Sequence, residues 1–177
     1  MSNFFILGLP RSRTTWLSAF LITDRVFCAH DVFSSEELCP EEFWGIEGYE
    51  YTGSVDTDSV LATPYLSNVD APLVIIDRCH LEVYESLSQI PHTNKDKLKY
   101  HLTNQMDALE EAKSFANLIV PYDKLDDMLE ELSYVCTPNV PFDTVKHTAF
   151  KGFDIQMPNL CGKAFNRRVG LWQQYGR

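Results

Sequence analysis

A short segment near the N-terminus combines two arginines with three hydroxyl side chains. It reads Gly8-Leu9-Pro10-Arg11-Ser12-Arg13-Thr14-Thr15-Trp16 and begins within the apolar run 4–9. That order predicts a buried strand, a turn and a helix that begins near Thr14. The unpaired backbone N–H groups at a helix start, with the positive end of the helix dipole, bind anions. The segment therefore predicts an anion-binding loop, although its Ser and Thr side chains can alternatively serve only as helix caps.

The loop differs from the G-x-x-x-x-G-K-[ST] loop of nucleotide triphosphatases. When that pattern is aligned on Gly8, Arg13 stands at the second Gly and Thr14 at the Lys. The Lys of the pattern reaches the terminal phosphates, and the hydroxyl that follows it binds magnesium. A loop without this Gly and Lys suits an anion smaller than a magnesium triphosphate, and we expect no metal.

Residues 10–16 resemble the P-[KR]-S-G-T-T-W loop of sulfotransferases, with Arg13 at the Gly position. In that family the loop holds the 5'-phosphosulfate of the donor 3'-phosphoadenosine 5'-phosphosulfate (PAPS). The resemblance therefore implies that the donor is bound by Pro10, Arg11, Ser12, Arg13, Thr14, Thr15 and Trp16. It also implies that Trp16 stacks on the adenine, whereas a large aromatic side chain in the first turn of a helix otherwise packs into the sheet.

A second apolar run, 72–77, predicts another buried parallel strand and ends at Arg78. Ser86 follows eight residues later, in a predicted helix. In sulfotransferases an Arg that leaves a central strand and a Ser eight residues further on bind the donor's 3'-phosphate, so the resemblance assigns this role to Arg78 and Ser86. About two helical turns return the hydroxyl to the same end of the sheet. An ion pair between Arg78 and Glu82 is the structural alternative.

Two further segments resemble the family less closely. Residues 118–125 are similar to its strand and Y-[ED]-x-L segment, for which we expect a structural role with Asp123 capping the next helix. Residues 167–175 are similar to its basic ending, which reaches the 3'-phosphate and would here supply Arg167 and Arg168. A solvated basic tail is the alternative for that ending.

Sulfuryl transfer is an in-line displacement that also needs a base to remove the acceptor's proton. The resemblance assigns to Arg11 the stabilisation of the oxygen that leaves with the phosphate. His30 is the first candidate for the base, because it follows the apolar run 26–29 and its imidazole titrates near neutral pH. A hydrogen-bonded structural His is the alternative. The acidic residues that compete for the role are Asp31, Glu36, Glu37, Asp56 and Asp58.

The alternation of strands and helices predicts a three-layer α/β/α fold with a mainly parallel sheet, and the resemblance implies the P-loop fold of sulfotransferases. Strands are predicted near 4–9, 26–29, 73–77 and 117–120, and helices near 14–22, 81–90, 95–113 and 124–134. We expect two long irregular regions, 31–60 and 137–159, to flank the acceptor site. The absence of repeats and linkers predicts one domain over residues 1–177.

The sequence has 15 basic and 25 acidic residues and a net charge of -10. Such a charge disfavours nucleic acid as a partner, and an anionic donor then requires the few arginines to be gathered locally. Five cysteines without a C-x-x-C pair predict reduced thiols. No run has the length of a membrane span or the pattern of a secretory signal. We therefore expect a cytoplasmic protein that binds no membrane.

These observations predict a sulfotransferase that transfers a sulfuryl group from PAPS to a hydroxyl or amine and releases adenosine 3',5'-bisphosphate (PAP). The chain is similar to the small sulfotransferase-like proteins of bacteria and their phages. Two alternatives stay open: a P-loop kinase acting on a nucleotide or metabolite, and a PAPS or nucleotide binder without catalytic activity. The sequence does not identify the acceptor.

Overall fold

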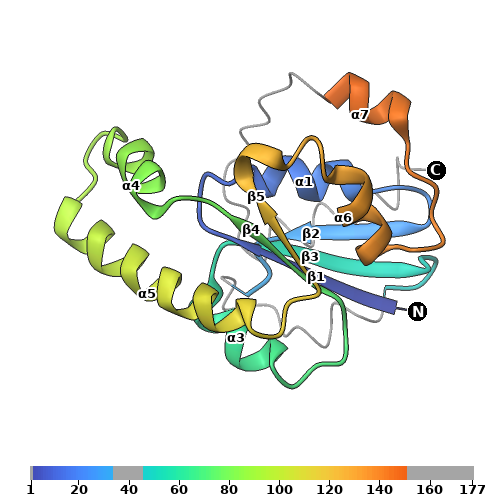
Figure 1. The fold of residues 1–177 in the computed structure, drawn as a ribbon, viewed down its shortest axis with the longest axis horizontal. Coiled ribbons are helices and arrows are strands. Elements are labelled where there is room, and N and C mark those ends of the chain that lie inside the picture. Colours follow the sequence, from blue (N-terminus) through green and yellow to red (C-terminus); the bar gives the residue numbers. More distant parts are fainter. Residues whose placement is uncertain (1, 34–45, 151–177) are drawn as a thin grey trace.

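The computed structural model describes residues 2–33 and 46–150, and a parallel sheet runs through the middle of this part of the chain (Figure 1). Its five strands lie side by side in the order β2-β3-β1-β4-β5, and every neighbouring pair is parallel. The strands are β1 (Ser2–Gly8), β2 (Val26–His30), β3 (Tyr51–Asp56), β4 (Leu73–Asp77) and β5 (Leu118–Pro121). All five carboxyl ends therefore point to one edge, where ligands bind in open parallel sheets.

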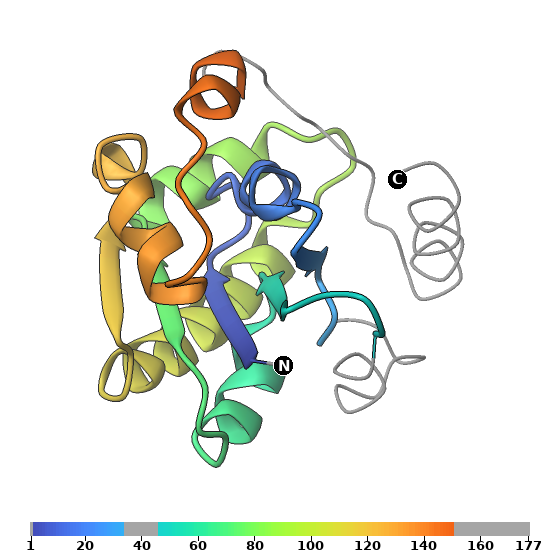
Figure 2. The ribbon, with the colours of Figure 1, turned by 90° about the vertical axis from the view of Figure 1, so that its right-hand side faces the viewer.

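Helices cover both faces of the sheet (Figure 2). One face packs against α1 (Thr14–Leu21) and α6 (Leu129–Cys136), and α7 (Thr144–Phe150) packs on α1. The other face packs against α3 (Ser59–Leu66), α4 (His80–Ser88) and α5 (Lys95–Lys113). A short 3-10 turn, η1 (Tyr122–Lys124), joins β5 to the segment before α6. The predicted three-layer α/β/α fold with a parallel sheet is confirmed.

Strand β1 shows why the apolar runs form the centre of the sheet. Successive side chains of a strand point to opposite faces, so Phe4 and Ile6 enter the core on the α1 side while Phe5 and Leu7 enter the core on the α3 side. A strand buried on both faces needs a continuous apolar sequence. Apart from the helix predicted over 124–134, the predicted strands and helices are found within two residues of their predicted bounds, and α5 spans the predicted 95–113.

The prediction of an irregular region over 31–60 is wrong for its second half, which contains β3 and the start of α3. The sequence of β3, Tyr-Thr-Gly-Ser-Val-Asp, has the polar and small residues of a turn, yet all six residues are buried. Its polar groups find partners inside the sheet: Thr52 Oγ1 donates to Asn3 Oδ1 at 2.8 Å. Such pairing removes the usual cost of burying a hydroxyl.

Two other expectations are also corrected. The helix predicted over 124–134 is instead η1 followed by α6, which begins only at Leu129, although Leu125, Leu129 and Leu132 are fully buried. Helix α7 lies within the region 137–159 that was predicted to be irregular.

The prediction of one domain over 1–177 includes undescribed residues and stays a prediction. Among the described residues, no helix combines the length and apolarity needed to cross a membrane.

Candidate active site

The turn between β1 and α1 holds two residues in the left-handed backbone conformation. Arg11 has a φ of 69° and Arg13 a φ of 59°, which costs a non-glycine residue about 1–3 kcal/mol. Gly, the residue at this position of the sulfotransferase pattern, adopts this conformation without the cost. Arg13 directly precedes α1, and its side chain forms no capping hydrogen bond. The start of α1 therefore has the form of an anion site.

Arg11, Arg78 and Ser86 come together beside this loop. The Nε atom of Arg11 donates to Ser86 Oγ at 3.2 Å, and Nη1 of Arg78 donates to the carbonyl oxygen of Arg11. Arg78 follows β4 directly and Ser86 lies in α4. The two residues predicted to hold a second phosphate thus both contact the first loop, although 75 positions separate Arg11 from Ser86 in the sequence.

Two of these arginines also lie over aromatic rings. The guanidinium carbon of Arg13 is 4.1 Å from the centre of the Trp16 ring, and that of Arg78 is 4.1 Å from the centre of the Tyr122 ring. Nη1 of Arg13 pairs with Asp126 Oδ1 at 2.9 Å. Tyr122 and Asp126 both follow β5, so this connection packs against both arginines. Such stacking orients guanidinium groups while it leaves some of their N–H groups available.

Two buried polar atoms at the loop have no hydrogen-bond partner. They are Ser12 Oγ, in a residue with no exposed surface, and Arg78 Nε. Arg78 Nε lies 3.5 Å from Glu82 Oε2, which satisfies the distance of an ion pair but not the geometry of a hydrogen bond. The predicted alternative of an Arg78–Glu82 ion pair is therefore present, yet it leaves the donor unused. Buried polar groups are rarely left unpaired in folded proteins.

Trp16 is buried, with only 2% of its surface exposed. Its ring stacks on Phe20 with centroids 5.3 Å apart and planes inclined by 3°, and its Nε1 donates to the carbonyl oxygen of Phe150 in α7 at 3.1 Å. Phe20 and the Arg13 guanidinium both lie over the indole, so an adenine ring can stack on Trp16 only after one of them moves. The packing role that the helix position predicted is present.

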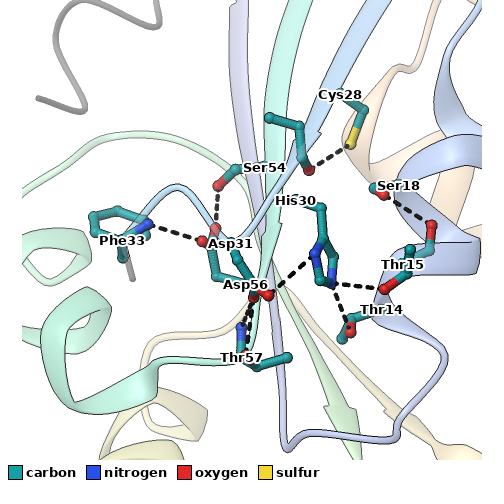
Figure 3. A network of polar contacts seen from close by, with 11 residues as sticks. Thr14, Thr15, Ser18, Cys28, His30, Asp31, Phe33, Ser54, Asp56 and Thr57 are labelled. Carbon is teal, nitrogen blue, oxygen red and sulfur yellow. Dashed lines mark hydrogen bonds and ion pairs between the residues drawn. The ribbon is translucent and has the colours of Figure 1, made fainter. Parts of the chain in front are cut away.

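His30 ends β2 and links it to the start of α1 (Figure 3). Its Nε2 lies 3.0 Å from Thr14 Oγ1 and 3.2 Å from Thr15 Oγ1. Its Nδ1 lies 3.1 Å from Asp31 Oδ2. The Oδ1 atom of Asp31 in turn accepts hydrogen bonds from the backbone N and the hydroxyl of Thr57, at 3.0 and 2.9 Å. A chain of polar contacts thus connects the loop hydroxyls to the carboxyl ends of β2 and β3.

Asp56 is a second carboxyl at this edge and is fully buried. Its Oδ2 accepts from Ser54 Oγ at 2.5 Å and its Oδ1 from the backbone N of Phe33 at 3.0 Å. Burial raises the pKa of Asp56 to about 7, against the opposing effect of these hydrogen bonds, and the nearby Asp31 raises it further. Near neutral pH this carboxyl is therefore present in both its protonated and its ionised form.

The predicted site residues all lie at the carboxyl edge of the sheet or in the helices that start there. Pro10 is half-buried in the loop, and the contacts above include the remaining residues except Ser12, whose hydroxyl is unpartnered. Sequence reasoning missed the roles of Tyr122 and Asp126 and treated Asp31 only as a competing base. The proximity of Asp31 to His30 in the sequence was the one signal for their pairing. Glu36, Glu37, Arg167 and Arg168 lie outside the described residues.

No protein-family model matches this sequence, and no curated protein does. Among solved structures, the mouse sulfotransferase SULT7A1 complexed with PAP is similar, with a TM-score of 0.54 and 12% identity. The likeness covers 84% of this chain and 62% of the mouse protein, so this chain spans less than two thirds of that protein's length. A shikimate kinase from Bacteroides thetaiotaomicron is similar over 97% of this chain and 98% of its own, with a TM-score of 0.42 and 14% identity. The first likeness shows a shared P-loop fold of the sulfotransferase kind.

Proposed function

We propose that this protein is a sulfotransferase that uses PAPS as donor and a hydroxyl or amine as acceptor. The observation that carries the proposal is the contact of Arg11 with Ser86 and Arg78 beside the start of α1. Two phosphate-binding groups that the sequence predicts separately are thereby joined in one site. The bound PAP of the mouse sulfotransferase with the same fold supports a similar ligand for this chain.

The charges of the site suit a ligand with several anionic groups. Arg11, Arg13 and Arg78 lie around the loop in a chain whose net charge is -10. Concentrated cations at a helix start raise the local concentration of an anion that the rest of the surface repels. The unpartnered Ser12 Oγ and Arg78 Nε supply two further donors. These residues fit the phosphosulfate and the separate 3'-phosphate of PAPS.

The same site suits a magnesium triphosphate poorly. Thr14 stands at the position of the phosphate-binding Lys, and its hydroxyl contacts His30. An ammonium group that reaches the terminal phosphates is therefore missing from this position. That this loop does not bind a magnesium triphosphate is inferred from the missing Lys and stays a prediction.

In this reaction Arg11 and His30 have different roles. The acceptor oxygen or nitrogen forms a bond to sulfur, while the bond between sulfur and the bridging oxygen of the 5'-phosphate breaks and PAP leaves. Arg11 neutralises the charge that grows on the bridging oxygen. His30 takes the acceptor's proton on Nε2, which lies beside the loop hydroxyls. The acceptor enters at the carboxyl ends of β2 and β3.

A binding comparison tests the donor. Titration calorimetry with PAP and with ATP plus magnesium is expected to give tighter binding of PAP. In Arg78→Ala the binding free energy of PAP is expected to weaken by roughly 2 kcal/mol or more, because a charge-assisted contact is lost. The matched control is Arg25→Ala, which removes an equal charge from the opposite edge, where Arg25 pairs with Glu50. Tighter magnesium-dependent binding of ATP would favour the P-loop kinase instead.

A transfer experiment separates the enzyme from a pure binder. The protein is incubated with PAPS labelled in the sulfuryl group and a mixed pool of small metabolites, and labelled products are separated. We expect label on at least one hydroxyl or amine compound, and much less label with Arg11→Ala. Tight PAP binding without transfer to any acceptor would identify a non-catalytic binder.

A further inference from the structure

We propose that Asp31 is the positioning residue of this site: it holds His30 in the tautomer whose unprotonated Nε2 faces the anion-binding loop. The catalytic meaning of this arrangement rests on the proposed sulfotransferase function. The tautomer itself depends only on the contacts of His30, so it can be tested independently of any donor or acceptor.

The contact between the two residues decides where the proton of the imidazole lies. Asp31 Oδ2 is 3.1 Å from His30 Nδ1, and an ionised carboxylate only accepts hydrogen bonds. Nδ1 must therefore carry the proton, which leaves Nε2 of a neutral imidazole with a lone pair. The side chains of His30 and Asp31 are only 12% and 9% exposed, so water competes little for this contact.

Asp31 is itself firmly held. Its Oδ1 accepts from both the backbone N and the hydroxyl of Thr57, and its own N donates to Val55 O at 3.0 Å. Its φ of 56° is left-handed, a conformation that persists in a non-glycine residue only where the surroundings enforce it. The backbone of β2 and β3 thus fixes the carboxylate, and the carboxylate fixes the imidazole (Figure 3).

The hydroxyls of Thr14 and Thr15 couple the Nε2 lone pair to the binding of an anion. Thr14 and Thr15 both approach Nε2, but one lone pair accepts only one hydroxyl proton at a time. The other hydroxyl can donate to an anion at the start of α1. An anion that takes both hydroxyl protons leaves the Nε2 lone pair for the acceptor's proton. Binding of the sulfuryl donor thereby makes the lone pair of His30, which Asp31 has oriented, available for the acceptor's proton.

Nitrogen-15 NMR of labelled histidine tests the tautomer, since protonated and unprotonated ring nitrogens have well-separated shifts. The signals of His30 are identified by their loss in His30→Gln. In spectra recorded where the imidazole of His30 is neutral, we expect Nδ1 protonated and Nε2 unprotonated. In Asp31→Asn the two donors of Thr57 hold the amide oxygen, so the amide N–H₂ faces Nδ1 and the proton is expected to move to Nε2. Asp56→Asn, which alters a neighbouring carboxyl bound to Ser54 and Phe33, is the control with an unchanged tautomer.

Kinetics test the consequence. Asp31→Asn is expected to lower kcat for sulfuryl transfer by about 100-fold or more, as for a misoriented general base, while the Kd of PAP changes by less than about threefold. A neutral wild-type His30 with its proton on Nε2, or a tautomer unaffected by Asp31→Asn, would overturn the proposal. If the tautomers are as expected but no transfer occurs in the wild type, the positioning stands and the proposed function fails.

Discussion

At the scale of single residues, Arg13 is the departure from the sulfotransferase pattern that most affects the site. Its left-handed backbone would suit Gly, yet its side chain pairs with Asp126 and covers Trp16. We expect Arg13 to contact the ligand, with Asp126 as an internal competitor for the same guanidinium. The pair is partly exposed, with 27% and 35% of the two side chains accessible, so the competition is weak.

Asp126→Asn is therefore expected to tighten PAP binding by a few-fold, about the worth of one exposed ion pair of 0.2–1 kcal/mol. Arg13→Gly is expected to weaken binding by about 10-fold or more, because a charge-assisted contact disappears while the backbone conformation is retained. Both are measured by calorimetry at low and high salt. Tighter binding in Arg13→Gly would instead show that the side chain obstructs the site.

The loop and the Arg78 and Ser86 pair were predictable from the sequence because each is a local pattern with fixed spacing. The contacts of Arg13 with Asp126 and of Arg78 with Tyr122 were not, since they join segments more than 40 positions apart. The pairing of β4 with β5 brings Tyr122 to Arg78, and the pairing of β1 with β4 adds the loop that carries Arg13. A short motif carries no information about such partners.

At the scale of elements, β3 shows how tertiary packing overrides local composition. Its Gly53 lies against the ring of Phe4 in β1, and a Cβ atom added there would stand 2.2 Å from Phe4 Cζ. The strand therefore requires a residue with no side chain at this position. The small residue that the packing requires at position 53 is also typical of turns, and composition alone therefore predicted a loop.

Gly53→Ala is expected to lower the free energy of unfolding by about 1–3 kcal/mol, the usual cost of overpacking a core. Urea unfolding followed by circular dichroism measures the loss. The double variant with Phe4→Leu, which removes ring atoms that the new methyl group meets, is expected to lose less than the sum of the single variants. Strict additivity would mean that the two side chains do not clash.

Neither α3 nor the break between η1 and α6 was predicted from the sequence. Pro64 lies inside α3, and an internal Pro normally argues against a helix. The α3 start is held by Asp58, whose Oδ1 accepts from Leu61 N and from the buried Gln105 of α5. Leu125, Leu129 and Leu132 are buried, but the 3-10 turn η1 ends at Lys124 and α6 begins only at Leu129. Periodicity identifies the buried face more reliably than the type of turn.

At the scale of the whole molecule, Asp56 makes the stability of the fold depend on pH. Burial raises its pKa from 3.8 to about 7. Between these values the folded protein keeps a proton that the unfolded chain has released, so the contribution of Asp56 to the free energy of unfolding falls as pH rises from about 4 to about 7. Above about pH 7 the contribution stays constant. A shift of this size corresponds to a loss of about 4 kcal/mol.

Asp56→Asn removes this titration while keeping the shape and the acceptor for Phe33 N. We expect the free energy of unfolding of the variant, relative to wild type, to increase by about 2–3 kcal/mol between about pH 5 and about pH 8, since about two pH units of the titration window lie in this range. Urea titrations of both proteins at the two pH values measure it, and the subtraction cancels the other carboxyls. A difference that does not change with pH would mean that the folded protein keeps Asp56 ionised at pH 5. In that case its hydrogen bonds with Ser54 and Phe33 stabilise the carboxylate more than burial destabilises it.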